Sequence, residues 1–406
     1  MLQTARTASP AAPPPWVTLA EVVRPFPAPR PPEPILLAPP TPTGAELAAI
    51  EASLATGWLA PAGPVPAAFE AALAETTGLP DVLATTSCTA ALHLGYRVLG
   101  LTPGDEVWTA GLTFIATIAP AVQMGAVPRF LDVTPDSWTL DPDLLRRELA
   151  RAARRGRLPR VVVPVDLFGQ CADLDAILEA CGRWGVPVLC DSAAALGASL
   201  RGRHAGQGAL LAAFSFNGNK IITTGGGGAL CTAEPRLLAA ARHLATQAKE
   251  PAAHYQHETT GFAYGLSSVL AAIGLAQLPS LSARVATKRG LFARYAAALA
   301  DLPGCTPMPE PAWGRSNRWL SVILLDPARG APDREQARRA LAAEGIEART
   351  VWKPLPLQPV FRDAPRAGGA VAARLFDHGL CLPSGCGLTE PQQARVIAIL
   401  RGLWRG

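Results

Sequence analysis

Regular alternation between short apolar runs and helical segments is the feature that most limits how this chain can fold. Runs such as DEVWTA (105–110), RVVVPVDLF (160–168) and VPVLCDSAA (186–194) are apolar and rich in β-branched residues. Segments with helical periodicity lie between them. Strands that are apolar on both faces and separated by helices are typical of a parallel sheet covered on both sides. We therefore predict an α/β fold with a mainly parallel sheet.

The 406 residues suffice for a large domain and a smaller one. Residues 1–33 are proline-rich and have no sustained period, so we expect an extended or disordered segment there. Residues 34–280 carry the strand–helix alternation and form the predicted large domain; a capping box of Thr43 and Glu46 predicts its first helix. Residues 281–406 begin with a long connecting helix and continue as a small α+β domain.

Composition excludes several classes of function. The net charge of +5 is small for this length, and the basic segment 145–157 reads as the solvated face of a helix, so we predict no nucleic-acid partner. The eight cysteines lie singly, without a C-x-x-C pair, which indicates buried reduced thiols and no metal site. With neither a signal-peptide pattern nor an apolar run near the ~20 residues that span a bilayer, we expect a cytoplasmic protein without membrane contact.

Unusual polar residues follow the ends of several predicted strands. Residues 86–89 (Thr-Ser-Cys-Thr) come after one strand and open a helix, and residues 113–114 (Thr-Phe) follow another. Asp191 ends a third strand, and Ser215 and Lys220 follow a fourth. Because ligands of open parallel sheets bind beyond the carboxyl ends of the strands, we expect these residues to converge on one site.

The chemistry of these residues favours pyridoxal phosphate. A helix that starts at residues 87–89 offers free backbone N–H groups to a phosphate, and Ser215 could add its hydroxyl. Asp191 ends a buried strand, where an unpaired carboxylate is costly, so a cation such as a pyridinium nitrogen should meet it. Lys220 precedes a glycine tract but is followed by Ile221, which excludes a P-loop, and taken alone it reads as an ordinary loop charge. Together with an Asp that meets a pyridinium, a lysine that forms a Schiff base is the pattern of pyridoxal phosphate. Phe114 could stack on the ring.

Several stretches in order carry a more specific resemblance. They are GWLAPAGPVPAAFEAALAE, SCTAALHLGYRVLGLTPGDEVWTAGLTFIATIAP, PVDLFGQCADLDAILEAC, FSFNGNKIITTGGGGAL, IEARTVWKPLPLQPVF and GLCLPSG. From about Ile35 to the C-terminus the chain resembles the DegT/DnrJ/EryC1/StrS family of pyridoxal-phosphate sugar aminotransferases, and within it the enzymes that aminate nucleotide-linked 4-keto-6-deoxy sugars. The resemblance implies the fold type I architecture with a seven-stranded type of sheet, and a homodimer with active sites at the subunit interface.

The resemblance also implies a role for each residue that matches a family motif. Lys220 is implied as the lysine that forms the Schiff base with pyridoxal 5'-phosphate, and Asp191 as the partner of the pyridine nitrogen. Phe114 is implied as the aromatic side chain that stacks on the ring. The implied phosphate-binding residues are Cys88, Thr89 and Ser215, the first mainly through its backbone N–H.

Four positions depart from the family pattern. Where the family usually has Asn-Tyr-Arg, with the asparagine reaching across the dimer to the phosphate, this chain has Ala263, Tyr264 and Gly265. Three residues after Asp191 the family usually has Gln, Glu or His, and this chain has Ala194. Pro356 replaces a histidine. The resemblance thus predicts the cofactor and leaves the substrate and the reaction open.

Three functions fit this pattern. The leading hypothesis is an aminotransferase that moves an amino group from glutamate or glutamine to a ketone of a nucleotide-linked deoxy sugar, in the synthesis of a cell-surface glycan or natural product. The second is dehydration, elimination or cyclisation of a non-sugar amine with the same cofactor. The third is a catalytically silent paralogue that binds the cofactor; the retention of Lys220 and Asp191 argues against it.

Overall fold

The structure is a computed structural model and describes residues 34–404. The predicted proline-rich segment, residues 1–33, lies outside the described residues. The chain from Ile35 onward forms one compact unit. The division into a large and a small domain at residue 280 remains a prediction.

The central sheet confirms the predicted α/β class. Its strands, in spatial order, are β1 (Asp81–Thr85), β9 (Gly228–Thr232), β8 (Leu211–Ser215), β5 (Leu189–Asp191), β4 (Val161–Val163), β2 (Glu106–Ala110) and β3 (Val127–Leu131). Parallel bridges from Val162 to Val188 and from Val165 to Asp191 join the two halves. β9 runs antiparallel to both of its neighbours, and the other pairings are parallel. A short strand, β14 (Arg366–Ala367), extends the β3 edge.

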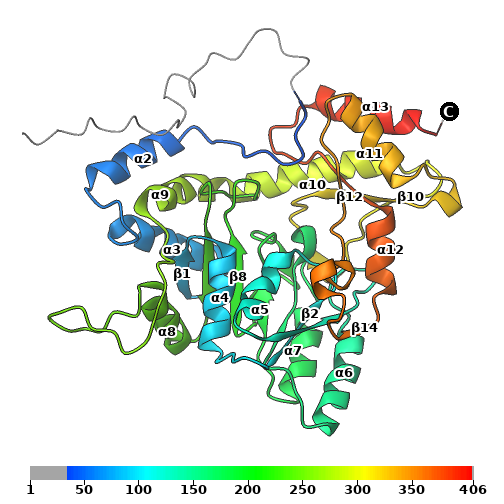
Figure 1. The fold of residues 1–406 in the computed structure, drawn as a ribbon. Helices are drawn as coiled ribbons and strands as arrows, with labels where there is room; N and C mark the ends of the chain where they lie inside the picture. Colours follow the sequence, from blue (N-terminus) through cyan, green and yellow to red (C-terminus); the bar gives the residue numbers. More distant parts are fainter. Residues whose placement is uncertain (1–33, 405–406) are drawn as a thin grey trace, which may run out of the picture. The chain divides into compact units, whose positions relative to one another are not determined.

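Helices cover both faces of this sheet, as the apolar strands require (Figure 1). Within β4, Val161 and Val163 join one apolar cluster and Val162 joins another, so successive side chains point into two separate cores. One core contains residues of α6 (Pro142–Arg154) and α7 (Leu174–Gly182); the other contains residues of α4 (Cys88–Val98), α5 (Ala119–Gln123) and α8 (Pro235–Ala245). Burial on both faces explains why no polar alternation appears in the strand sequences.

A second, antiparallel sheet is built from the C-terminal part of the chain. It consists of β10 (Cys305–Pro307), β12 (Ser321–Leu325), β15 (Gly379–Leu382) and β13 (Arg349–Thr350), with the helices α11 (Arg334–Ala343), α12 (Ala370–His378) and α13 (Glu390–Gly402). A small sheet joins β11 (Gly314–Arg315), β6 (Ser199–Leu200) and β7 (Arg203–His204). The predicted connecting helix is α10 (Leu281–Ala298).

The N-terminal helices show how far local signals carry. Glu46 accepts hydrogen bonds from the backbone N–H groups of Thr43 (2.7 Å) and Gly44 (2.9 Å), as the capping box predicts. The Thr43 hydroxyl, however, accepts from Ala45, and α2 (Glu46–Ala55) begins only at Glu46. α3 (Pro64–Thr77) ends at Gly78, whose φ of 65° makes it a left-handed C-cap.

One expectation about apolar length needs correction. The helical stretch Ser268–Ala298, made of α9 (Ser268–Gln277), a 3-10 turn and α10, is long and apolar enough by length and composition to cross a membrane. Within it, Arg284 donates to the Thr41 carbonyl at 2.6 Å, and buried Lys288 donates to two further carbonyls. α9 also lies beside α2 (Figure 1). These contacts are typical of a core helix.

Candidate active site

One cavity of about 1220 Å³ is lined by all of the predicted site residues. These are Cys88, Thr89, Phe114, Asp191, Ser215 and Lys220. They come from the carboxyl ends of β1, β2, β5 and β8 or from the segments that follow these strands. The expected convergence at one edge of the parallel sheet is therefore what the structure shows.

The start of α4 forms the end of the cavity where an anion could bind. Ser87 caps this helix, because its hydroxyl accepts a hydrogen bond from the Ala90 N–H at 3.0 Å. Cys88 and Thr89 are the first two helical residues, so their N–H groups have no partner within the helix. Helix N-termini of this kind bind phosphate groups. Burial, followed by the nearby Asp191, raises the pKa of the Cys88 thiol well above its usual range.

The glycine tract after Lys220 packs closely against this helix. A Cβ added to Gly228 would lie 2.3 Å from the Cys88 backbone nitrogen and 2.4 Å from the Ser87 carbonyl carbon. A side-chain rotation could not relieve these contacts, because both atoms belong to the backbone. Gly228 therefore allows β9 to pass directly beneath the start of α4.

Asp191 is buried and held from two sides. Its Oδ2 accepts a hydrogen bond from the Thr117 hydroxyl at 2.6 Å, and its Oδ1 accepts from the Ala193 N–H at 3.1 Å. Burial raises the pKa of this carboxyl, while the two hydrogen bonds and Lys220 oppose the rise. A cation that entered the cavity and met Asp191 would offset the cost of burying its charge.

Thr117 belongs to the site, although the sequence analysis did not identify it. It is buried, and its hydroxyl is 2.7 Å from that of Thr113, which must donate because the Thr117 hydrogen goes to Asp191. The buried Tyr96 hydroxyl donates to the Thr117 carbonyl at 2.6 Å and fixes the backbone there. The signal in the sequence was a Thr at i and i+4 directly after β2, a spacing that is common and carries no chemistry by itself.

A second carboxyl, that of Asp166, lies behind Asp191. Asp166 accepts from the Ser192 hydroxyl at 2.6 Å and from the Ala172 N–H at 2.9 Å, and its own N–H donates to the Asp191 carbonyl. Burial raises the pKa of Asp166 to about 6, with the Asp191 charge adding to the rise. Asp166 therefore links the loops that follow β4 and β5.

Lys220 is half-buried in the cavity and has a low pKa. Burial lowers its pKa to about 8, and the nearby Cys88 and Asp191 oppose that change. Its Nζ lies 3.9 Å from the centre of the Trp319 ring. A lysine with such a pKa carries a larger uncharged fraction at neutral pH than an exposed lysine, as a nucleophile or proton acceptor requires.

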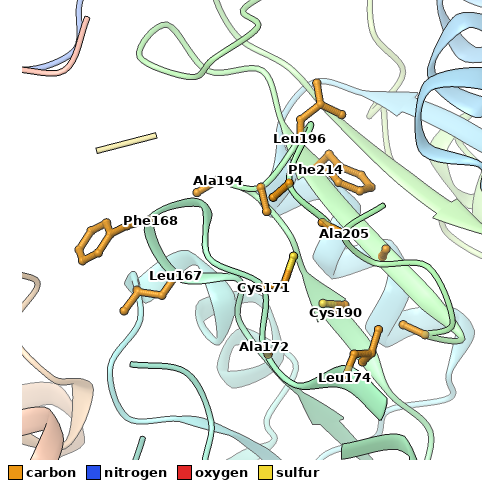
Figure 2. Close-up of a cluster of buried hydrophobic side chains, with 14 of the residues drawn as sticks. Leu167, Phe168, Cys171, Ala172, Leu174, Cys190, Ala194, Leu196, Ala205 and Phe214 are labelled. Atoms are coloured by element: carbon orange, nitrogen blue, oxygen red, sulfur yellow. The ribbon is translucent and has the colours of Figure 1, made fainter. Parts of the chain in front are cut away.

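Aromatic side chains line another wall of the cavity. Phe114 is 55% exposed, and its ring lies 5.6 Å from that of Trp352. Trp352 in turn packs on Phe168 at 4.8 Å and on Trp319 at 6.3 Å. Phe168 is itself buried and belongs to the same apolar cluster as Cys171 and Cys190 (Figure 2). The exposed Phe114 ring leaves a flat apolar surface for a planar ligand.

Of the four positions at which the chain departs from the pattern that the resemblance implies, one lines the cavity and three do not. Ala194 lines it, on the loop after β5 (Figure 2). Pro356, Ala263 and Gly265 are not among its lining residues. Ala263 is exposed, and Gly265 pairs with Thr85 at the end of β1. A Cβ at Gly265 would lie 2.6 Å from the Pro61 Cβ, so this backbone leaves no room for a side chain.

Comparisons with known proteins identify a family and several relatives of this chain. Residues 41–401 match the model of the DegT/DnrJ/EryC1/StrS aminotransferase family. The chain is 45% identical to EpsN of Bacillus subtilis, named as a pyridoxal phosphate-dependent aminotransferase, over 91% of this chain and 96% of that protein. It is 35% identical to GDP-perosamine synthase of Caulobacter vibrioides, over 85% and 91% of the two chains. The structure of DesI in the presence of its TDP-sugar product matches with a TM-score of 0.83 and 30% identity, over 92% and 93%.

The fold and the cavity, together with these relatives, define a pyridoxal-phosphate-dependent aminotransferase of fold type I. The match extends over nearly the whole described chain, far beyond a single motif. The chain belongs to the DegT/DnrJ/EryC1/StrS aminotransferase family.

Proposed function

We propose that this enzyme transfers an amino group from glutamate or glutamine to the keto group of a nucleotide-linked deoxy sugar, in cell-surface glycan or natural-product synthesis. The observation that carries the proposal is one cavity that contains both Lys220 and Asp191 in a chain 35% identical to a GDP-perosamine synthase. The volume of about 1220 Å³ is large enough for a cofactor together with part of a nucleotide sugar. DesI, whose structure was determined in the presence of its TDP-sugar product, supports the same class of acceptor.

The residues present fit pyridoxal phosphate, and we assign their roles as follows. The N–H groups of Cys88 and Thr89 hold the phosphate, with the Ser215 hydroxyl beside them. Asp191 pairs with the ring nitrogen, Phe114 stacks on the ring, and Lys220 attaches the cofactor covalently. When bound, the cofactor supplies an electron sink that stabilises negative charge on the carbon next to the transferred nitrogen.

Lys220 then has a second task in this proposal. Once its amine is released, it takes a proton from one carbon and returns it to another, which requires a pKa near neutrality. With a pKa of about 8, roughly one amine in ten is uncharged at pH 7. Thr117 keeps the Asp191 carboxylate oriented through its 2.6 Å hydrogen bond.

We further propose a homodimer in the cytoplasm. Exposed apolar side chains, among them Trp58, Leu59 and Ile115, form surface that a second copy would cover. All eight cysteines lie in the described part of the chain and are unpaired, which suits a reducing compartment. Light scattering of the purified protein measures the mass, and a monomer at micromolar concentration would contradict the dimer.

A two-step absorbance experiment tests the reaction. Glutamate or glutamine should convert the visible band of the bound cofactor to the ultraviolet band of its pyridoxamine form, and a nucleotide-linked 4-keto-6-deoxy sugar should restore it. Because Ala194 leaves the cavity wall without the usual polar group, elimination or dehydration of a non-sugar amine is the second candidate. It predicts product formation without conversion to the pyridoxamine form. No spectral change with any donor would indicate a silent paralogue.

A further inference from the structure

The side chain beneath the Lys220 amine is the indole of Trp319. Its ring centre lies 3.9 Å from Nζ, well within the range of a cation–π interaction. Among the described residues, no carboxylate oxygen lies within 4.0 Å of Nζ and no hydrogen bond from Nζ is formed. The Trp319 ring is therefore the group that contacts the charge of this amine most directly.

Trp319 is fixed by hydrogen bonds at three points. Its indole N–H donates to the Asn219 carbonyl at 2.8 Å, immediately before Lys220 in the chain. Its backbone N–H donates to the Asn317 side chain at 2.8 Å, and its carbonyl accepts from buried Lys288 at 3.1 Å. A ring held at the side chain and at the backbone on both sides keeps its face toward Lys220 without further loss of side-chain entropy.

The same contacts connect Trp319 to the loop after Asp191. The buried Asn317 amide donates to the carbonyls of Ala194 (2.8 Å) and Leu196 (2.9 Å). Asn317 thus holds the β5 loop while its oxygen holds Trp319. Trp319 is 4% exposed and lines the cavity, so its position is determined by the two segments that carry the catalytic pair.

We propose that Trp319 is a positioning residue whose indole face binds the Lys220 ammonium whenever that amine is not bonded to the cofactor. The ring holds the released amine inside the cavity and stabilises its charged form against burial. The other titratable groups that face Lys220 are Asp191 from β5 and Cys88 from α4; Lys353 lines the same cavity. The proposal rests on the proposed role of Lys220 as the covalent anchor and does not depend on the identity of the substrate.

The test measures cofactor capture. Cofactor-free protein is mixed with pyridoxal phosphate at a series of pH values, and the rate of appearance of the visible band is recorded. The rate rises with pH as Lys220 loses its proton. In Trp319→Leu the ammonium loses the ring while burial still disfavours its charge, so the midpoint of the profile should move down by about one pH unit. Trp319→Phe, with a smaller ring, should give a smaller shift.

Two controls separate positioning from a structural role. Trp313→Leu removes a tryptophan that lies outside the cavity and packs against the Arg201 guanidinium, and its midpoint should equal that of the wild type. Fluorinated tryptophans placed at position 319 keep the shape of the ring and weaken its negative face, so the midpoint should fall stepwise with fluorine number. If Trp319→Leu does not fold, this series alone tests whether the indole face binds the Lys220 ammonium.

An unchanged midpoint across the fluorinated series would overturn the proposal. A lower amount of captured cofactor at every pH, without a shift, would indicate that Trp319 only supports the fold and would overturn it equally. Failure of the anchor is recognised separately, because Lys220→Ala would then still capture the cofactor covalently. Failure of the sugar substrate leaves every capture profile unaffected.

Discussion

The floor of the cavity and the segment at residues 263–265 are built in different ways. On the floor, Asp191 receives hydrogen bonds from a hydroxyl and a backbone N–H, and Lys220 rests on a fixed indole ring. At residues 263–265, Ala263 is exposed and Gly265 has no side chain, at the two positions where the family resemblance implies Asn and Arg. The floor thus carries ionisable groups fixed by neighbouring side chains, while Ala263 and Gly265 carry no polar side chain.

This contrast indicates that the two regions differ in how strictly the surrounding structure restricts the choice of residue. A buried carboxylate and a half-buried amine need partners at fixed distances, so several neighbouring side chains support the floor, and replacing any one of them disturbs the others. An exposed residue such as Ala263 can be replaced at little cost to the fold. We therefore expect substitutions of Asp191 or Lys220 to reduce the reaction rate strongly. Substitutions at residues 263–265 should change the affinity for the cofactor moderately.

The largest expected effect is the loss of covalent attachment in Lys220→Ala. After borohydride reduction, mass spectrometry of the wild type should find the phosphopyridoxyl group on the peptide that contains residue 220. The variant should carry none, because Lys353, the other lysine among the described residues that line the cavity, is exposed. Lys353→Ala, which removes the exposed lysine that lines the same cavity, is the matched control and should remain labelled. Labelling of Lys220→Ala at another lysine would contradict the assignment.

Asp191→Asn should reduce turnover by about 10²–10³-fold or more while the protein remains folded. An amide cannot keep the ring nitrogen protonated, so charge developing in the transition state is less stabilised. Thr117→Val keeps the carboxylate but removes its 2.6 Å hydrogen bond, and a loss of about tenfold is expected. Stopped-flow measurement of the amino-donor step gives both numbers. If Asp191 only capped the following turn, its replacement would cost about 1 kcal/mol of stability and leave the rate nearly normal.

The sequence predicted the class of the fold and the residues of the floor, because both depend on local patterns. Doubly apolar strands indicate a covered parallel sheet, and polar residues at strand ends must then meet at one edge. It could not predict Thr117 or Trp319. Both act through contacts between segments far apart in the chain, such as Thr117 with Asp191 and Trp319 with Lys288, and neither residue type signals such a role by itself.

The sequence also could not predict the hydrogen bonds at the start of α2 or the packing at Gly265. Thr43 and Glu46 have the spacing of a capping box, but the Thr43 hydroxyl turns to Ala45, and one half of the motif does not form. At Gly265 the sequence shows only that a side chain is missing. The structure adds that Pro61 occupies the space in which a Cβ would lie, so the arginine cannot be restored by substitution at that position alone.

Ala263→Asn tests the segment at residues 263–265 directly. If the asparagine of a second copy normally binds the phosphate, its restoration should tighten cofactor binding by roughly ten- to a hundredfold, the value of one hydrogen bond to a charged group. Equilibrium dialysis of the wild type and the variant against a series of pyridoxal phosphate concentrations gives the ratio. Ala263→Gln, which is longer by one methylene, serves as the control for polarity without the right reach. Equal affinity of wild type and Ala263→Asn would show that another group already holds the phosphate.

The smallest expected effect concerns Asp166 and the pH dependence of stability. Its pKa in the folded protein is about 6, above the ordinary value of 3.8, so folding favours the protonated form. As the pH rises through this interval, the unfolded chain releases the proton first and the free energy of unfolding falls; the fall ends only about one unit above the folded-state pKa. Between pH 5 and pH 7 the wild type should therefore lose about 1 kcal/mol relative to Asp166→Asn. Urea unfolding of both proteins at these two pH values measures the difference. Parallel curves would mean that Asp166 is ionised throughout, and that the floor of the cavity tolerates two neighbouring negative charges without a bound cation.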